Sequence, residues 1–173
     1  MTYTTLHLMR FIVLAFLLGL SFITFGTNQA LAYFTTAQEA VALDNHSGLF
    51  LIDYTFGVAK HEVHLPVHAQ NNGTNSPSAV SFTILDENNA VVEGTATAVV
   101  LSNASLQRNG MYRVSKNLGR KFTLAVIFTP TTPKPEKTYR LQVTHLPFDF
   151  DGTQALQLNP SELKYYTTKP ISL

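Results

Sequence analysis

The chain has 173 residues, of which 45% are hydrophobic and 13% charged, with twelve Lys and Arg, eleven Asp and Glu, and neither Cys nor Trp. This length accommodates one domain, and the apolar content excludes intrinsic disorder. The absence of Cys excludes disulfides, thiolate metal sites, a Cys nucleophile and the lipid-bearing Cys of a lipoprotein.

Residues 1–32 have the features of a secretory signal peptide. Arg10 precedes the uncharged, largely apolar residues 11–26, and Ala30-Leu31-Ala32 follows a short polar stretch. A basic region, an apolar region and a small-residue cleavage site in this order direct export. We expect cleavage after Ala32 and a periplasmic or extracellular protein, because export without disulfides fits bacteria better than animal secretion. The alternative is an uncleaved membrane anchor through residues 11–26, although a bilayer span usually needs roughly 20 residues.

Removal of the signal peptide makes the remaining chain formally neutral. Arg10 is the only charged side chain in the segment, so eleven Lys and Arg then face eleven Asp and Glu. Binding of nucleic acid depends on clustered positive charge at phosphates, so a nucleic-acid partner is excluded. Contact with a membrane is expected only if the N-terminal segment stays attached.

Residues 33–47 are the expected lead-in to the folded domain, which we place at residues 48–173. Thr36 and Glu39 have the spacing of a helix capping box, and Val41 follows two residues later. This pattern allows one short helix within the lead-in.

Apolar residues alternate with period two from Gly48 onward, which predicts strands. One face of the first strand carries Phe50, Ile52, Tyr54 and Phe56. Residues 60–69 form a second run with Val63 and Leu65 on its apolar face, and the short connection predicts a hairpin. Pro66 lacks a backbone N–H, which places the second strand at a sheet edge or at a bulge.

A second hairpin is expected across a turn at residues 86–89. Residues 80–84 alternate before this turn, and residues 91–101 form a long strand after it. One face of the long strand holds the small residues Gly94, Ala96 and Ala98. Small side chains permit close approach, so we expect aromatic rings of the opposing sheet at this face.

Further strands are predicted at residues 111–115, 122–128 and 138–144. Within the last of these, Tyr139-x-Leu141-x-Val143 resembles the tyrosine-corner strand of immunoglobulin-like and fibronectin-like sandwiches. The resemblance implies that architecture and no activity. The sequence Asn-Pro-Ser-Glu at residues 159–162 predicts a single helical turn.

Seven or eight strands separated by turns in about 130 residues predict an all-β fold. The expected architecture is a single two-sheet antiparallel β-sandwich of the immunoglobulin-like type, with at most one or two short helical turns. The export signal, together with Gly48-Leu49-Phe50, Leu65-Pro66 and Asn159-Pro160-Ser161-Glu162, also resembles small exported bacterial proteins of no assigned function. That second resemblance implies a compartment and a fold but no chemistry.

Three His residues form the first candidate metal site. His64 and His68 lie on one face of a predicted strand, and His61 is close in sequence. Two imidazoles on one face can bind Zn²⁺ or Cu²⁺. Their separation along a strand is about 13 Å, so a shared ion requires a bulge at Pro66.

Two carboxylates form the second candidate metal site. Asp149 and Asp151, followed by Gly152, resemble the start of a calcium-binding loop, in which alternate carboxylates surround the cation. The twelfth position of such a loop carries a Glu, and here it is Pro160. An irregular calcium site remains the hypothesis for this segment.

No local signature of catalysis occurs in the sequence, because both a Gly-x-Ser-x-Gly turn and a Gly-rich phosphate loop are absent. The sequence therefore predicts an exported, non-enzymatic structural or interaction domain of the bacterial cell envelope or exterior, without a cofactor. It is expected to contact a protein partner through a strand edge or loops. The alternative is a carbohydrate- or divalent-cation-binding module that uses Tyr165, Tyr166 and residues 149–152. Adjacent residues of a strand point to opposite faces, so at least one of the two Tyr is expected in the core.

Overall fold

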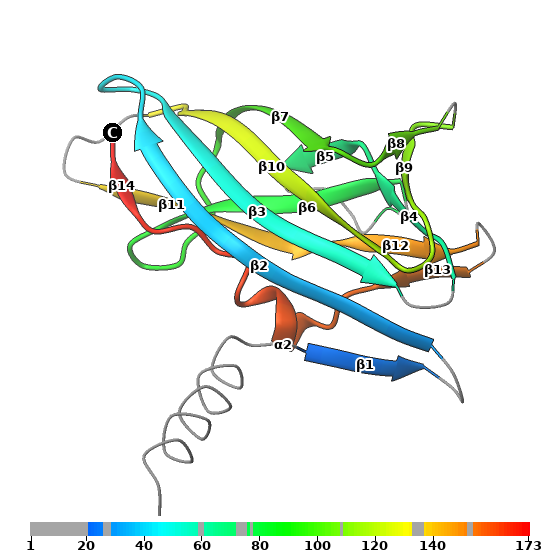
Figure 1. Cartoon of the computed structure of the whole chain (residues 1–173). Helices are drawn as coiled ribbons and strands as arrows, with labels where there is room; N and C mark the ends of the chain where they lie inside the picture. Colours follow the sequence, from blue (N-terminus) through cyan, green and yellow to red (C-terminus); the bar gives the residue numbers. More distant parts are fainter. Residues whose placement is uncertain are drawn as a thin grey trace, which may run out of the picture.

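The computed structural model of the protein describes residues 21–25, 29–58, 61–71, 76, 78–107, 109–132, 137–151 and 154–173. In this part of the chain the elements are fourteen strands and one helix (Figure 1). They are β1 (Ser21–Phe25), β2 (Gln29–Ala42), β3 (Gly48–Val58), β4 (Val63–Pro66), β5 (His68–Asn71), β6 (Ala79–Asp86), β7 (Gly94–Ser102), β8 (Ser105–Leu106), β9 (Met111–Val114), β10 (Leu118–Pro130), β11 (Thr138–His145), β12 (Pro147–Phe150), β13 (Gln154–Gln157), α2 (Pro160–Leu163) and β14 (Ile171–Ser172).

The strands form three sheets. Sheet A has the order β1-β2-β3-β10-β7, sheet B the order β13-β12-β4-β9-β8, and sheet C the order β14-β11-β6-β5. Neighbouring strands are antiparallel except for β5 and β6, which are parallel. The predicted all-β class is confirmed, but the expected two sheets are three, and the strands are more numerous than the seven or eight expected.

The additional strands arise where the chain leaves one sheet for another. The run predicted at residues 60–69 is divided after Pro66, because β4 belongs to sheet B and β5 to sheet C. β11 ends at His145 in sheet C, and β12 begins at Pro147 in sheet B. A continuous alternating pattern therefore corresponds to two strands in different sheets.

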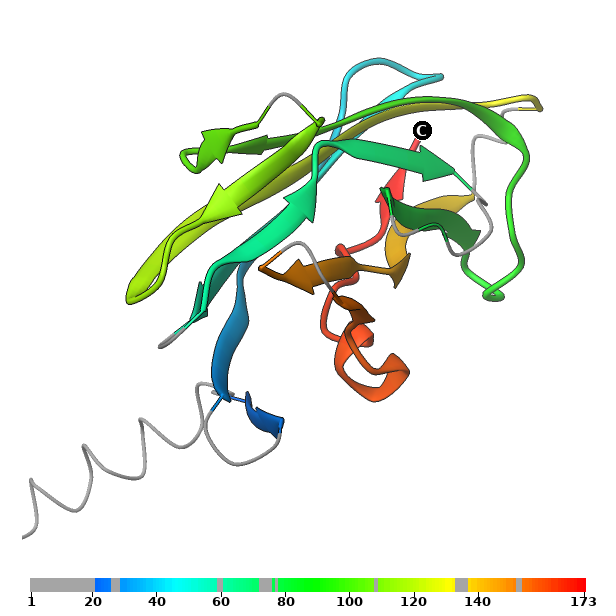
Figure 2. The ribbon, with the colours of Figure 1, turned by 90° about the vertical axis from the view of Figure 1, so that its right-hand side faces the viewer.

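One hydrophobic core joins all three sheets. Sheet A arches over the strands of sheets B and C (Figure 2). Buried side chains of all three sheets belong to one cluster. Phe50 and Phe56 of β3 are fully buried, as the alternation predicts. Strand β10 contributes four more buried side chains to the same face: Phe122, Leu124, Val126 and Phe128. Every second residue of these strands thus faces the core.

The first predicted hairpin is wrong, and the second is present only next to its turn, where Leu85 and Val91 form an isolated antiparallel bridge. β3 pairs with β2 and β10, and β4 pairs with β9 and β12. The turn at Asp86 is present, but β6 pairs with β5 and β11, whereas β7 pairs with β10. The chain therefore crosses between sheets at these two places, because the apolar faces of consecutive strands cover the core from opposite sides.

The short helix allowed within residues 33–47 is also wrong. Residues 29–42 form β2, which pairs with β3 from Leu31 to Ala42 with a register shift between Thr35 and Ala37. Pairing satisfies the backbone groups along one side of the long strand β3, which a helix here would leave without partners. Sheet A therefore includes residues that precede Gly48. The part of the predicted signal peptide in residues 1–20 lies outside the described residues.

The C-terminal segment contains the predicted helical turn. In α2 the Glu162 side chain accepts a hydrogen bond from the backbone N–H of Asn159 at 3.0 Å. Leu163 and Tyr166 are buried, and the backbone N–H of Val143 donates to the Tyr166 carbonyl at 2.9 Å. These contacts attach the segment to β11.

Candidate functional site

Strand β7 is the long edge strand of the described fold. The edges of the three sheets are β1, β5, β7, β8, β13 and β14, and all except β7 have two to five residues. β7 has nine residues, Gly94–Ser102, and contains no charged residue and no Pro. It lies at the end of sheet A beyond β10 (Figure 1). Natural sheets usually protect a long edge with charge, Pro or a bulge.

The backbone groups of β7 alternate between its two sides. On the side away from β10, the Val100 N–H donates to the Val67 carbonyl at 3.3 Å. On the side of β10, the Glu93 carbonyl accepts a hydrogen bond from the Thr131 N–H at 3.0 Å. Odd-numbered residues therefore bond to β10, and even-numbered residues direct their N–H and C=O groups to the edge. Gly94, Ala96 and Ala98 belong to the second set.

The edge is closed at both ends of this stretch. The Val92 N–H donates to the Ile84 carbonyl at 2.9 Å, and at the other end Val100 donates to Val67. The Tyr112 hydroxyl also donates to the Val100 carbonyl at 3.1 Å. Between these points β5 lies close to β7, but none of the described residues pairs with the edge of β7. We call residues 94–98 the open edge.

An exposed apolar surface adjoins the open edge on the outer face of sheet A. Val99 and Leu101 of β7 are 44% and 52% exposed, and Ile127 of β10 is 46% exposed. Ile127 lies directly beside Thr97, and Val99 lies beside Ala125. Contiguous exposed apolar side chains on a folded domain typically mark an interaction surface.

The opposite edge of sheet A is better protected. Beyond its short pairing with β1, β2 contains the register shift at Thr35 and the acidic residue Glu39. The Gln38 side chain donates to the Tyr165 carbonyl at 3.0 Å, so the C-terminal segment lies against β2. Along residues 94–98, β7 has no bulge and no charged residue, and its neighbour on this side is β5, which lies close to it without pairing.

The predicted His and Asp candidates are brought together, but in separate pairs. Nδ1 of His64 lies 2.8 Å from Asp149, and Nδ1 of His61 lies 2.8 Å from Asp151. Both pairs join the start of β4 to β12 and the turn after it, which are adjacent in sheet B. His68 lies on β5 in sheet C, so it does not share a strand face with His64.

These pairs do not form a group of converging ligands. Among the described residues, no three His, Asp or Glu side chains are arranged to hold one metal ion. The Asp149 and Asp151 carboxylates instead contact imidazoles, and Glu62 Oε1 lies 3.8 Å from Nε2 of His64. The two His–Asp pairs therefore link β4 and the residues before it to β12 and the turn after it.

Asp151 combines its ion pair with an unusual backbone conformation. Its φ of 53° lies in the left-handed region, which Asp and Asn tolerate better than most residues. The hydrogen bond from His61 and that from the backbone N–H of Glu62, which donates to Oδ1 at 3.1 Å, lower the pKa of the Asp151 carboxyl below its ordinary value of 3.8.

We expect Asp151→Asn to reduce stability at pH 5 and to have little effect at pH values well below 3.8. A carboxyl whose pKa is lowered by folding stabilises the protein above its unfolded pKa, and this contribution disappears as pH falls through the folded pKa. Asn retains the tolerance for positive φ. Urea unfolding of both proteins across this pH range measures the effect, and an equal difference at every pH would contradict it.

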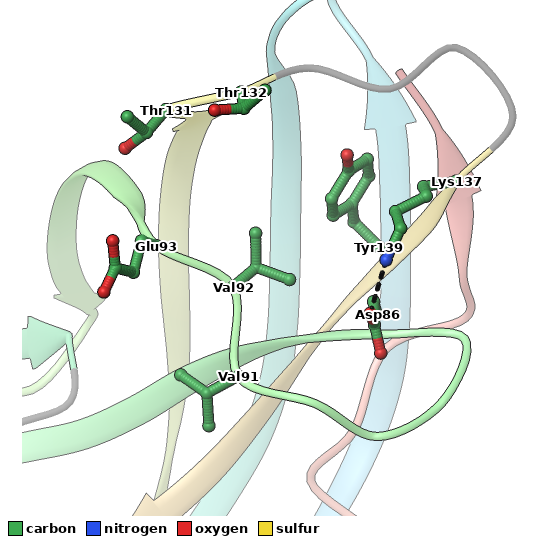
Figure 3. A pocket seen from close by; sticks show the side chains of 8 residues that line it. All are labelled: Asp86, Val91, Val92, Glu93, Thr131, Thr132, Lys137 and Tyr139. Carbon is green, nitrogen blue, oxygen red and sulfur yellow. Dashed lines mark hydrogen bonds and ion pairs between the residues drawn. The ribbon is translucent and has the colours of Figure 1, made fainter.

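A small pocket lies where β7 and β10 meet the turn after β6 (Figure 3). It has a volume of about 240 Å³ and is lined by Asp86, Val91, Val92, Glu93, Thr131, Thr132, Lys137 and Tyr139. The Lys137 ammonium lies 2.7 Å from the Asp86 carboxylate, which also accepts from the backbone N–H groups of Asn88 and Ala90 at 2.9 Å. Lys137 and these backbone groups lower the pKa of Asp86. Asp86 thus holds the turn closed and has a structural role.

The aromatic residues with described side chains do not form a sugar-binding face. Tyr165 is 60% exposed and Tyr166 is buried, so one of the pair is in the core as expected. Among the residues with described side chains, Tyr165 is the one large aromatic that is exposed. Stacking on a sugar therefore has a single ring available in this part of the chain.

Comparisons with known proteins add little to this geometry. No family model matches the chain, and no curated protein matches its sequence. Among solved structures, the chain is similar to the GAE domain of yeast GGA1 in the crystal structure titled GGA1_GAE domain-P21, at 10% identity and a TM-score of 0.27. The match covers 82% of this chain and 100% of that chain, and at this score it carries no argument on function. The described residues contain no helix with the length and apolar character to span a bilayer.

Proposed function

We propose that this protein is an exported, non-enzymatic interaction domain of the bacterial cell envelope or exterior, which binds a protein partner through the open edge of β7. Addition of an extended strand to a sheet edge satisfies the exposed backbone groups and draws affinity from main-chain hydrogen bonds. The outer apolar side chains beside the edge contribute further contact area.

The observation that carries this proposal is the combination of neutral residues, unpaired backbone groups and adjoining exposed apolar side chains at β7. An edge of this kind without charge, Pro or bulge over residues 94–98 is an aggregation hazard unless a partner covers it. The shorter edges of sheets B and C present fewer backbone groups. The His–Asp pairs and the pocket at Asp86 are explained by links within the fold, whereas β7 has no such explanation.

Site-specific crosslinking in the producing cell tests this function. A photoreactive amino acid at the exposed Thr97 is expected to form a covalent protein adduct, while the same group at Thr144, an exposed Thr on β11, is expected to form none. Ala96→Pro blocks one outward N–H and should abolish the adduct at Thr97. Thr95→Lys adds a charge at the same edge and serves as a second blocking variant.

Unchanged thermal midpoints show that both blocking variants remain folded. An adduct at Thr97 that persists in both folded variants would overturn the proposal, and so would the absence of any adduct. Equal adducts at Thr97 and Thr144 would indicate non-specific contact and would also contradict it.

The proposed export leads to a separate prediction about the N-terminus of the protein. We expect the exported protein to begin at Tyr33, since Ala30-Leu31-Ala32 is a cleavage site for a signal peptidase. Cleavage there removes β1 and the first residues of β2 but keeps the pairing of Tyr33–Ala42 with Gly48–Phe56. β2 is then the second long edge strand of sheet A, and it differs from β7 by its register shift, by Glu39 and by the hydrogen bond of Gln38 to Tyr165. Mass spectrometry of the protein recovered from the periplasm or medium measures the N-terminus. Recovery only inside the cell with residues 1–32 attached would contradict export.

A further inference from the structure

Strand β5 lies where a strand added to the open edge would have to lie. β5 is parallel to β6, and the chain reverses before β7, where Leu85 and Val91 form an antiparallel bridge. β5 is therefore antiparallel to β7. The hydrogen bond from Val100 to Val67 places the start of β5 beside the end of β7, and the two strands lie close together. No backbone hydrogen bond joins the described residues of β5 and β7.

β5 is weakly attached to the fold. It has four residues and pairs with β6 alone among the described strands, in the parallel arrangement, which is slightly less stable than the antiparallel one. None of its residues is fully buried, whereas every residue of β6 is buried. The Asn71 side-chain oxygen is buried without a hydrogen-bond partner among the described residues, which is a cost that release to water removes. Segments with few buried contacts open at a lower free energy than the whole fold.

We infer that β5 is a displaceable strand and that the strand of the protein partner takes its place between β6 and β7. This inference rests on the proposed function, whose open edge it uses. The partner's strand regains the backbone hydrogen bonds that β5 makes with β6. It also bonds to Ala96 and Ala98 of the open edge, which β5 does not. The replacement therefore gains main-chain hydrogen bonds, which are the source of affinity in strand addition.

Backbone groups of β6 face the replaced strand. The Ile84 carbonyl accepts a hydrogen bond from Val92, on the side of β6 away from β11. Bonding directions alternate along a strand, so Val80 and Phe82 direct their N–H and C=O groups to the same side, where β5 lies. The partner's strand thus meets Val80 and Phe82 on one side and the open edge on the other.

The position of β5 also restricts the sequence of the partner's strand. Ala69 of β5 packs against the hydrophobic core and lies opposite the fully buried Val80. Ala96 and Ala98 of β7 pack against the same core. The next residue of β5 toward its start, His68, is exposed. We therefore expect an extended partner segment with an apolar residue at the inward position and polar residues beside it, because a buried unpaired charge is costly.

A disulfide between β5 and β6 tests the replacement in the full chain, which has no Cys of its own. Gln70 lies opposite Ser81, and its side chain donates to the Ser81 hydroxyl at 3.2 Å. Neighbouring strands are about 4.8 Å apart, which permits a disulfide in Gln70→Cys/Ser81→Cys. The photoreactive amino acid at Thr97 reports binding in the producing cell. We expect the oxidised variant to lose the protein adduct and the reduced variant to retain it.

The double variant Thr83→Cys/Gln142→Cys is the matched control. The two residues lie opposite each other on β6 and β11, so their disulfide joins two strands of sheet C without holding β5. Its oxidation should leave the adduct at Thr97 unchanged. Equal loss of the adduct from both disulfides would overturn the inference, because the loss would then not depend on β5.

The same experiment separates failure of the inference from failure of the proposed function. An equal adduct at Thr97 in the oxidised and reduced forms of Gln70→Cys/Ser81→Cys would overturn the displacement of β5 and leave β7 as an interaction edge. No adduct in any variant, including the chain without Cys, would overturn both.

Amide hydrogen exchange in the isolated full chain tests the displacement without a partner. Val80 and Phe82 bond to β5, whereas Thr83 and Leu85 bond to β11. Departure of β5 should let Val80 and Phe82 exchange faster than Thr83 and Leu85, and the disulfide between β5 and β6 should remove this difference. Equally slow exchange at all four residues in the unmodified chain would show that β5 leaves only when the domain unfolds, and would overturn the inference.

Discussion

Phe122→Ala is expected to lower the free energy of unfolding by about 3–5 kcal/mol, the usual cost of truncating a buried Phe. Phe122 is fully buried on β10, its ring stacks on Tyr54 with centroids 5.4 Å apart, and Tyr112 meets it edge-on at 5.9 Å. Removal of the ring therefore leaves a cavity and removes two aromatic contacts. Urea unfolding monitored by tyrosine fluorescence measures the change.

The neighbouring residue provides a matched control. Thr123 is partly exposed on the outer face of the same strand, and its hydroxyl donates to the Asp53 carboxylate. Thr123→Ala removes this hydrogen bond without opening a core cavity, so its cost should be about 1 kcal/mol. Equal losses from Phe122→Ala and Thr123→Ala would contradict the assignment of the two faces of β10.

Gly94→Ala is expected to destabilise the protein by about 1–3 kcal/mol, because the added methyl group cannot fit without a shift of the backbone. An ideal Cβ at Gly94 would lie 2.4 Å from the Thr129 carbonyl oxygen and 2.5 Å from the Phe128 ring. The small residue thus lets an aromatic side chain approach closely, as the sequence predicted. The ring belongs to the adjacent strand β10 and not to the opposing sheet.

Gly119 on β10 gives the comparison for this prediction. A Cβ at Gly119 would meet its nearest atom, Thr55 Cγ2, at 3.7 Å, which is ordinary contact. Gly119→Ala should therefore leave stability unchanged or raise it by about 0.4–1 kcal/mol, because Ala lowers the conformational entropy of the unfolded chain. Thermal unfolding of the two variants tests the difference. A Gly94→Ala protein as stable as Gly119→Ala would contradict the close contact with Phe128.

The faces of the strands were predictable from the sequence because alternation is a local property. Phe50 and Phe56 on β3 and Phe122 on β10 are buried where the period of two places them. The capping residues of α2 are equally local, and Glu162 does bond to Asn159. Such patterns depend on residues within one turn or one strand.

Strand pairing was not predictable in the same way. Backbone hydrogen bonds carry no side-chain signature, so the pairing of β3 with β10 was not visible. For the same reason, β3 was wrongly joined to β4, and the pairing of β6 with β7 was extended beyond the single bridge of Leu85 with Val91. The contact of His64 with Asp149 joins residues from distant parts of the chain for the same reason. Composition did identify β7 as uncharged, but only the sheet order shows that it is an edge.

The most direct test of the account measures amide hydrogen exchange along β7 in the full chain. We expect slow exchange at Thr95, Thr97 and Val99, which bond to β10, and fast exchange at Ala96 and Ala98, which face the edge. Equal protection of odd and even residues would show that the edge is already covered within the chain, and would contradict the proposed interaction edge.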